Sequence, residues 1–163
     1  MARQVMPKLE EYYRRKIAQE GFDLFAVFSR FEYAMKNGGF RRKQSADAAW
    51  KTFAESLPHH FFERMWIAPP AVVYFARPPK RLDIDGDDGV KWSDDARSPT
   101  NAAELFDCIK TARNNLFHGD KRHDNRRDTE LMTAALFILN AAYETVEHED
   151  AFQRFVSAME FGL

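Results

Sequence analysis

The sequence predicts an all-α fold, a bundle of four to five helices with a partly extended insertion around 69–97. Apolar residues recur at helical spacing over most of the chain, glycines and prolines stand where these segments end, and only the insertion lacks the helical period. The 163 residues fit a single domain, 1–163. A chain of this size buries roughly 70% of its unfolded surface, so it needs no disulfide or structural metal to fold.

The N-terminal third predicts two helical regions. From Met6 to Lys36, large apolar side chains recur at helical spacing, and Gly21 either breaks or merely weakens this helix. The stretch 37–39, Asn-Gly-Gly, is typical of a helix C-terminus. A second helix follows, with Ser45 or Asp47 as its N-cap and an end at Pro58, before a short helical turn over 59–66.

The insertion 69–97 is expected to be mostly exposed. Two proline pairs bracket 71–77, whose sequence AVVYFAR is β-prone. Apolar residues then flank an Asp/Gly-rich turn, as in a β-hairpin: Leu82, Ile84, Val90 and Trp92. The aspartates of this turn alternate as in a calcium loop, but Asp88 and Asp94 replace the glycine and glutamate of such loops, which favours a plain turn.

The C-terminal half predicts three helices. The first starts at 98–100, Ser-Pro-Thr, and runs to residue 118 with Gly119 as its C-cap. Its apolar stripe consists of Leu105, Phe106, Ile109, Ala112 and Leu116. The second starts at Asp128 or Thr129 and buries Leu131, Ala134, Ala135, Ile138, Ala142 and Val146. The third spans about 149–159 and packs Phe152, Phe155 and Val156.

Composition restricts the class of protein. A lone cysteine, Cys108, is no disulfide framework and is typical of a reducing compartment. The chain has no apolar run of about 18 residues and no signal-peptide core at its start, so we expect a cytoplasmic protein that does not enter the membrane. The net charge is −1, whereas dedicated nucleic-acid-binding domains are often far more basic. Any RNA-binding charge must therefore be local.

The segment 113–119, RNNLFHG, interrupts the apolar helix with polar residues. At about 100° per residue, Arg113, Asn114 and His118 span an arc of roughly 140° with the residue at 117. A histidine takes or gives a proton near neutral pH, and an arginine grips a phosphate and stabilises its developing charge. These residue types suit cleavage of a phosphodiester without a metal, and a two-fold dimer would supply the second proton carrier.

RNNLFHG resembles the R-x4-H signature of the HEPN family, whose members are compact bundles of four or five helices with this motif at the end of a late helix. Many are metal-independent endoribonucleases of toxin–antitoxin, phage-defence or CRISPR systems, and they dimerise so that two motifs face each other. The resemblance implies Arg113 and His118 as catalytic residues, Asn114 as support, no metal or cofactor, RNA as substrate, and a homodimer with an antitoxin or other protein partner. A toxin subgroup carries a modified tyrosine where this chain has Asp120, so that form of control is not expected here.

Two further predictions concern residues around the motif. Glu32 falls on an apolar helix stripe, and the resemblance implies that it pairs with Arg113 or orients His118; otherwise it is a boundary glutamate that reaches solvent. The basic cluster after the motif is expected to hold the RNA backbone, or else it is a solvated loop: Lys121, Arg122, Arg126 and Arg127.

Plain alternatives remain at this point. His118 caps its own helix through the helix dipole, and Arg113 forms an ordinary surface ion pair. In function, the rival to a ribonuclease that leaves 2′,3′-cyclic phosphate and 5′-hydroxyl ends is a non-catalytic HEPN-like module that binds RNA, a nucleotide or a protein.

Overall fold

The computed structural model describes residues 8–87, 89–94, 96–117 and 126–160. Within these ranges the chain is mostly helical, with one two-stranded sheet, which confirms the predicted all-α class. The α-helices are α1 (Leu9–Lys16), α2 (Gln19–Asn37), α3 (Trp50–Ser56), α4 (His60–Ile67), α5 (Val72–Ala76), α6 (Ala102–Phe117), α7 (Arg126–Val146) and α8 (Gln153–Glu160). The strands are β1 (Leu82–Asp85) and β2 (Gly89–Trp92), and 3-10 turns span Pro69–Ala71 and Asp150–Phe152.

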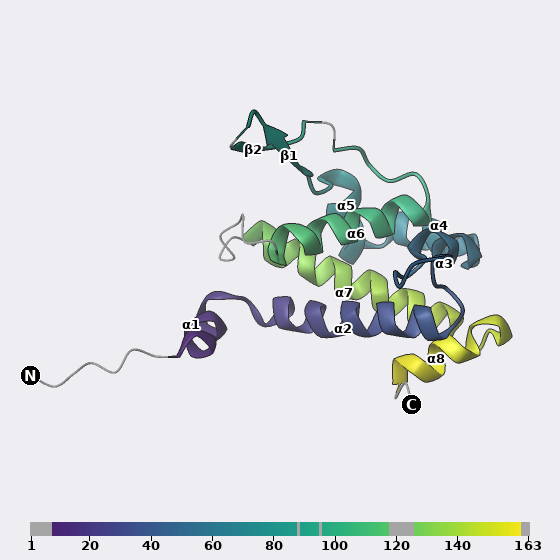
Figure 1. The fold of residues 1–163 in the computed structure, drawn as a ribbon. Helices are drawn as coiled ribbons and strands as arrows, with labels where there is room; N and C mark the ends of the chain where they lie inside the picture. The colour runs from purple at the N-terminus through teal and green to yellow at the C-terminus, as the bar shows by residue number, and fades with distance from the viewer. Residues whose placement is uncertain (1–7, 88, 95, 118–125, 161–163) are drawn as a thin grey trace, which may run out of the picture.

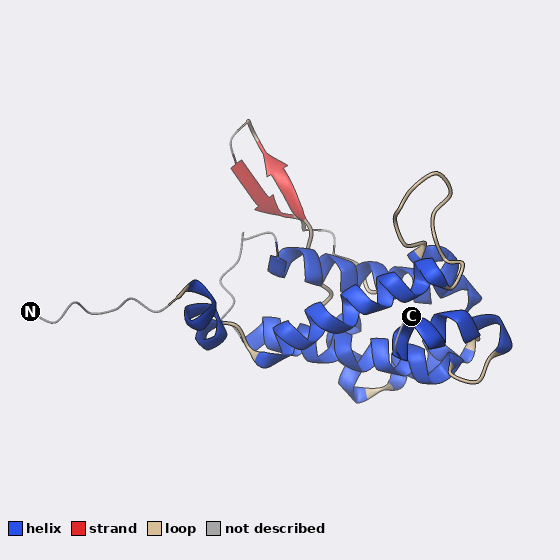
Figure 2. Ribbon diagram, turned by 60° about the horizontal axis from the view of Figure 1, so that its bottom comes forward, coloured by secondary structure: helices blue, strands red, loops and turns tan. Residues whose placement is uncertain are grey.

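Helix α7 lies at the centre of the bundle. It packs against α2 on one side and against α6 and α5 on the other, as Figure 1 and Figure 2 show. Helix α8 crosses the second half of α2, and α3 covers α6. Four alanines of α7 are buried, and their small side chains let the neighbouring helices approach closely: Ala134, Ala135, Ala141 and Ala142.

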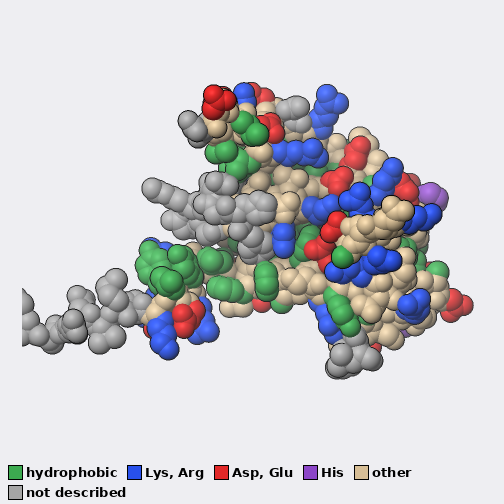
Figure 3. All heavy atoms as spheres, viewed as in Figure 1, with side chains coloured by type: hydrophobic (Ala, Val, Ile, Leu, Met, Phe, Trp, Pro, Cys, Tyr) green, Lys and Arg blue, Asp and Glu red, His purple; other side chains and the backbone are tan. Residues whose placement is uncertain are grey.

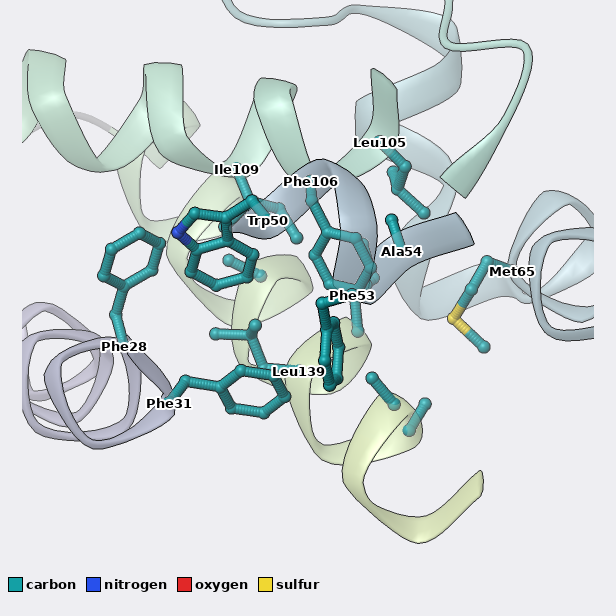
Figure 4. Close-up of a cluster of buried hydrophobic side chains, with 14 of the residues drawn as sticks. Phe28, Phe31, Trp50, Phe53, Ala54, Met65, Leu105, Phe106, Ile109 and Leu139 are labelled. Atoms are coloured by element: carbon teal, nitrogen blue, oxygen red, sulfur yellow. The ribbon is translucent and has the colours of Figure 1, made fainter. Parts of the chain in front are cut away.

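Buried aromatic side chains from α2, α3, α4, α5, α6 and α8 fill the core, and Figure 4 shows those of α2, α3 and α6 together. Phe53 of α3 is fully buried, and its ring centroid lies 4.9 Å from that of Phe155 and 5.6 Å from that of Phe31. Trp50 stacks on Phe31 at 5.9 Å with nearly parallel planes. Ring pairs at these separations contribute about 0.5–1.5 kcal/mol each beyond the area they bury.

The first helical region is divided at a different residue from the one the sequence singled out. The break falls at Ile17 and Ala18, between α1 and α2, and Gly21 lies inside α2. Gly21 is buried, and a Cβ there would lie 2.8 Å from Cγ2 of Ile17 and 3.2 Å from Sδ of Met132. The absence of a side chain at Gly21 therefore lets α2 lie close to α7. The predicted stop after Asn37 is confirmed.

The N-cap predicted for the second helical region was wrong. Ser45 and Asp47 do not cap α3, which begins at Trp50. Instead, the Ser45 hydroxyl donates to the Asp47 carboxylate at 2.8 Å, in the turn that precedes the helix. Side chains of this type satisfy local turns as readily as helix ends, so the sequence alone does not choose between the two.

The first part of the insertion 69–97 was predicted as a β-prone exposed run, and this is wrong. Residues 69–71 form a 3-10 turn and α5 follows, with Val73 and Tyr74 buried. The Tyr74 hydroxyl donates to the carbonyl oxygen of Leu131 in α7 at 2.9 Å. Packing against α7 overrides the β preference of valine and tyrosine, and the proline pair suits the first turn of a helix.

The second part of the insertion was predicted correctly. β1 and β2 pair antiparallel, with Leu82 opposite Trp92 and Ile84 opposite Val90. The hairpin extends away from the helices (Figure 1, Figure 2), and Ile84 is 80% exposed.

The apolar stripes predicted for the C-terminal half are confirmed, because every residue listed for them is buried. Helix α6 starts later than expected, since Asn101 accepts the backbone N–H of Glu104 at 2.9 Å as its N-cap. Among the described helices, none is long and apolar enough to cross a membrane.

Candidate functional site

The motif residues 113–117 form the last turn of α6, and α7 begins at Arg126. The proposed catalytic His118 lies outside the described residues. The end of α6, the start of α7 and the start of α2 lie at the same end of the bundle, which we call the motif end (Figure 1). The described part of the motif contacts Phe28 in the middle of α2 and the backbone of Lys80, in the segment before β1.

Arg113 is held from two sides. Its guanidinium carbon lies 5.2 Å from the centroid of the Phe28 ring in α2. Its Nη1 donates to the side-chain oxygen of Asn114 at 3.1 Å. Cation–π contacts of this kind contribute about 0.5–2 kcal/mol and restrict where a planar guanidinium lies. Asn114 therefore supports Arg113 directly, through a contact between neighbouring side chains.

A chain of contacts runs from Arg113 to Glu32. The Phe28 ring stacks on Trp50 at 5.0 Å, and the Trp50 Nε1–H donates to Oε2 of Glu32 at 3.1 Å. Glu32 lies one helical turn after Phe28 and is half-buried. The Glu32 carboxylate thus accepts a hydrogen bond from a core tryptophan. Its predicted role beside the motif stays a prediction.

Asn115 was not singled out from the sequence. It is 8% exposed, and its Nδ2–H donates to the carbonyl oxygen of Lys80 at 2.8 Å. This bond ties the last turn of α6 to the root of the hairpin. The two residues are far apart in sequence, and no local pattern predicts their contact.

A polar pocket of about 420 Å³ adjoins the motif, between the hairpin root and α6. It contains two cations, Arg81 and Lys110, and Lys110 Nζ lies 3.9 Å from Oδ1 of Asp107. The amide of Asn114, which contacts Arg113, faces this pocket as a lining residue. The lining residues are Arg81, Leu82, Asp107, Lys110, Thr111, Asn114 and Asn115.

The predicted RNA-binding cluster is only partly described. Lys121 and Arg122 lie outside the described residues. Arg126, in the first turn of α7, is exposed, and its Nε lies 3.4 Å from Oε1 of Glu130. Its side chain is 94% exposed and so remains accessible to a phosphate.

Arg127 has structural contacts that the sequence did not predict, and its predicted contact with RNA stays a prediction. It is half-buried, and its Nη2 donates to the carbonyl oxygens of Arg77 at 2.9 Å and Pro78 at 3.3 Å. The neighbouring Arg77 pairs with Glu130 at 2.8 Å. These bonds fasten the end of α5 to the start of α7, so Arg127 has a structural role whether or not it also meets RNA.

Cys108 offers no nucleophile near neutral pH. The thiol is half-buried on α6, and burial raises its pKa to about 11, with a further rise from the nearby Asp107 and Glu104 carboxylates. The thiolate is the reactive form, so the raised pKa makes this cysteine a poor nucleophile near neutral pH. In the part of the chain that the structure describes, no group of three or more His, Cys, Asp or Glu side chains is placed to hold a metal ion.

No protein-family model matches the chain, and no curated protein or solved structure matches it either. Any inference about function therefore rests on the residues of the motif end.

Proposed function

We propose that this protein is a metal-independent endoribonuclease of the HEPN type, active as a homodimer and cleaving RNA to 2′,3′-cyclic phosphate and 5′-hydroxyl ends. Arg113 and His118 are the proposed catalytic residues, with Asn114 and Glu32 in support. The resemblance extends the proposal to a role as a toxin or defence protein, with an antitoxin as its protein partner.

The observation that carries the proposal is the placement of Arg113. Its guanidinium is oriented by the Phe28 ring and by Asn114, in the helical turn that leads directly to His118. A pocket with two further cations, Arg81 and Lys110, lies beside it. A fixed arginine with cations nearby is what recognition of a phosphate chain requires.

In the proposed reaction, one His118 takes the proton of the ribose 2′-hydroxyl, whose oxygen attacks the neighbouring phosphorus. The bond between phosphorus and the 5′-oxygen of the next nucleotide breaks. A second His118, from the other copy of the chain, donates a proton to that leaving oxygen. Arg113 binds the scissile phosphate and stabilises the charge that develops on its oxygens.

The test is cleavage of an end-labelled single-stranded RNA in buffer with EDTA. The His118→Ala variant should lose activity by at least about a hundredfold, the usual contribution of a general acid or base. Arg113→Lys keeps the charge but loses the guanidinium fork, and it should lose about as much. The same oligonucleotide with 2′-deoxyribose throughout should remain intact.

Two exposed residues at a distance from the motif end serve as matched controls: His148, which follows α7, and Arg154 on α8. His148→Ala and Arg154→Lys should cleave like the wild type. Full activity in His118→Ala, or loss of wild-type activity on adding EDTA, would contradict the proposal.

A non-catalytic binding module is the second candidate, and two observations favour it. The net charge of −1 is low for a protein that holds RNA by charge alone. The pocket of about 420 Å³ beside Asn114 falls in the size range of small-ligand sites. Binding of RNA or of a nucleotide by the wild type, without any cleavage, would identify this function instead.

A further inference from the structure

A second pocket, of about 530 Å³, adjoins the pocket beside the motif. It lies between the segment around the hairpin root and the first half of α6. Three residues line both pockets, Arg81 before β1 and Asp107 and Thr111 on α6, so the two volumes meet there. We call the joined volumes the hairpin cleft. The proposed reaction assigns no role to the second pocket.

The wall that α6 contributes to the hairpin cleft is a continuous polar stripe. Its residues recur at intervals of three and four: Glu104, Asp107, Thr111 and Asn114. At about 100° per residue, these four positions span an arc of roughly 80° on the helix. Helix α6 rises about 1.5 Å per residue, so the stripe is roughly 15 Å long. A ligand of the size of a nucleotide can therefore contact it along its whole length.

The two halves of the cleft differ in charge. The pocket beside the motif, which we call the motif half, is lined by the cations Arg81 and Lys110 and by one described acid. The second pocket, which we call the acidic half, is lined by Asp83, Glu104 and the shared Asp107. In Figure 3, acidic and basic side chains lie side by side on the hairpin and on the helices below it. A negatively charged group therefore suits the motif half, whereas the acidic half favours a group that donates hydrogen bonds.

Asn115 presents a fixed hydrogen-bond acceptor on the wall of the motif half. Its side chain is more than nine-tenths buried, and its Nδ2 donates to the carbonyl oxygen of Lys80 at 2.8 Å. Within the described residues, Oδ1 of Asn115 accepts no hydrogen bond. Since polar atoms of buried side chains are normally paired, this oxygen is available to a donor on a ligand.

Two carboxylates of the acidic half have oxygens available to a ligand. Oε2 of Glu104 accepts the backbone N–H of Thr100 at 2.7 Å and the Thr100 hydroxyl at 2.8 Å, which leaves Oε1. These bonds hold the pKa of the Glu104 carboxyl below its ordinary value, so the group is charged at neutral pH. Oδ1 of Asp107 lies 3.9 Å from Nζ of Lys110, beyond hydrogen-bond length, so both oxygens of Asp107 can accept.

Three classes of ligand do not suit the acidic half. In the part of the chain that the structure describes, its acids are not grouped to hold a metal ion. A phosphate would meet like charges there. A polyamine would meet the guanidinium groups of Arg81 and Arg97, which line the same space. A neutral group with several donors remains.

Among the nucleic-acid bases, guanine has the edge that matches a carboxylate. It presents two donors side by side, N1–H and the N2 amino group, and a carboxylate accepts two bonds at once. Adenine and cytosine place an acceptor beside their amino group, and uracil places its N–H between two carbonyl groups. Arginine side chains also stack on the faces of bases, and the exposed Arg97 lines the acidic half.

We propose that the hairpin cleft binds a guanine nucleotide. The base lies in the acidic half, where Asp107 accepts N1–H and the N2 amino group and Arg97 stacks on the ring. The phosphate lies in the motif half, where Arg81 and Lys110 bind it. The acids that line only the acidic half repel the phosphate, and this sets the direction of the nucleotide in the cleft.

A free guanine nucleotide and a guanosine within an RNA strand present the same groups to the cleft. In RNA, the phosphate in the motif half lies beside Asn114, which contacts Arg113, so cleavage would favour a site next to a guanosine. This preference alone rests on the proposed function. Binding of the nucleotide is measured without any cleavage.

The first test is isothermal titration calorimetry of the full chain with three nucleoside 5′-monophosphates. Guanosine monophosphate (GMP) should bind at least about tenfold more tightly than inosine monophosphate (IMP), which differs from it only by lacking the N2 amino group. Adenosine monophosphate (AMP) should bind at least as weakly as IMP. The factor is that of one hydrogen bond to a charged acceptor.

Asp107→Asn tests the acceptor. The variant replaces one carboxylate oxygen by an amino group, which opposes the donors of guanine but matches the donor and acceptor of adenine. It should lose at least about tenfold in affinity for GMP and gain affinity for AMP. Because an unfolded variant cannot gain affinity, the gain separates recognition from loss of structure. Asp150→Asn, an exposed aspartate after α7, is the matched control and should keep the wild-type preference.

Lys110→Ala tests the phosphate half. It should weaken binding of GMP about tenfold and leave binding of guanosine, which has no phosphate, nearly unchanged. Lys51→Ala, on α3 and outside both pockets, should change neither affinity.

A competition experiment in the His118→Ala background distinguishes the two sources of the nucleotide. The probes are two single-stranded RNA oligonucleotides that differ by inosine in place of one guanosine. Displacement of GMP by the guanosine oligonucleotide, and only weakly by the inosine one, identifies RNA as the ligand. Binding of GMP that neither oligonucleotide displaces identifies a free guanine nucleotide.

Equal affinity for GMP and IMP, no binding of GMP at millimolar concentration, or an unchanged preference in Asp107→Asn would each overturn the proposal. If GMP binds as proposed and no RNA is cut, the ribonuclease proposal fails while this one stands. If RNA is cut without any preference for guanosine and GMP does not bind, this proposal fails and the ribonuclease stands.

Discussion

The two ends of the bundle are built from different contacts. At the end where α2 stops and α8 crosses it, aromatic rings surround Phe53, and the side chains involved are almost entirely apolar. At the motif end, the contacts are between cations, rings and carbonyl oxygens: Arg113 on Phe28, and Arg127 on the backbone of 77–78. The interior of one end is packed with apolar rings, and the other end combines cations, rings and amides beside a polar pocket.

This difference separates stability from ligand binding. Burial of large aromatic side chains provides most of the free energy of folding, and it does so without presenting any group to a ligand. The motif end presents an arginine, amides and a pocket, and it is held in place by contacts that individually contribute about 1 kcal/mol. A substitution at the aromatic end should therefore lower the free energy of unfolding, whereas one at the motif end should mainly change RNA binding or cleavage.

The largest expected effect is at the aromatic end. Phe53→Ala should lower the free energy of unfolding by about 3–5 kcal/mol, because it leaves a cavity among packed rings. Phe25→Ala, at the motif end and 55% exposed, should cost less than about 1 kcal/mol. Urea denaturation at about 1 µM protein, where association is weak, measures both. Equal costs for the two variants would contradict the contrast between the ends.

The aromatic end was largely predictable from the sequence, and the reason is local periodicity. The stripes of α6 and α7 repeat every three to four residues, so any core they meet buries them. The hairpin was predictable because alternation and a turn lie in one short segment. Residues 71–77 were not, since valine, tyrosine and phenylalanine suit a strand by propensity, and only contact with α7 makes them helical.

The motif end was predictable only in part. The order of residues in RNNLFHG indicated Arg113 and Asn114, and their mutual contact follows from adjacency. The bonds from Trp50 to Glu32 and from Asn115 to Lys80 join residues 18 and 35 positions apart. Such contacts depend on how helices are placed in space, and a single sequence carries no local signal for them.

A smaller effect is expected for the two cations of the pocket. If RNA passes beside Asn114, Arg81→Ala and Lys110→Ala should each weaken RNA binding and reduce the salt slope of the binding constant by about one. Arg81 is exposed and Lys110 is half-buried, and neither belongs to the apolar core, so thermal unfolding should change little.

The measurement is a salt titration of RNA binding in the His118→Ala background, where RNA stays intact. Lys51→Ala is the matched control, because its side chain on α3 is 81% exposed and lies away from this pocket. An unchanged slope in both pocket variants would place the RNA elsewhere and leave the pocket to a different ligand.

The smallest effect on stability is expected for Glu32→Gln. This variant also distinguishes a catalytic role of Glu32 from a packing role. The glutamine carbonyl oxygen can still accept the Trp50 Nε1–H, so the free energy of unfolding should change by less than about 0.5 kcal/mol. If the carboxylate charge serves Arg113 or His118, cleavage should fall about tenfold.

Trp50→Phe makes the opposite change: it removes the donor and leaves the carboxylate in place. It should lower the unfolding free energy by about 1 kcal/mol or more. Loss of cleavage in Glu32→Gln with activity retained in Trp50→Phe assigns Glu32 to the chemistry, whereas full activity in Glu32→Gln assigns it to packing at the border between the two ends.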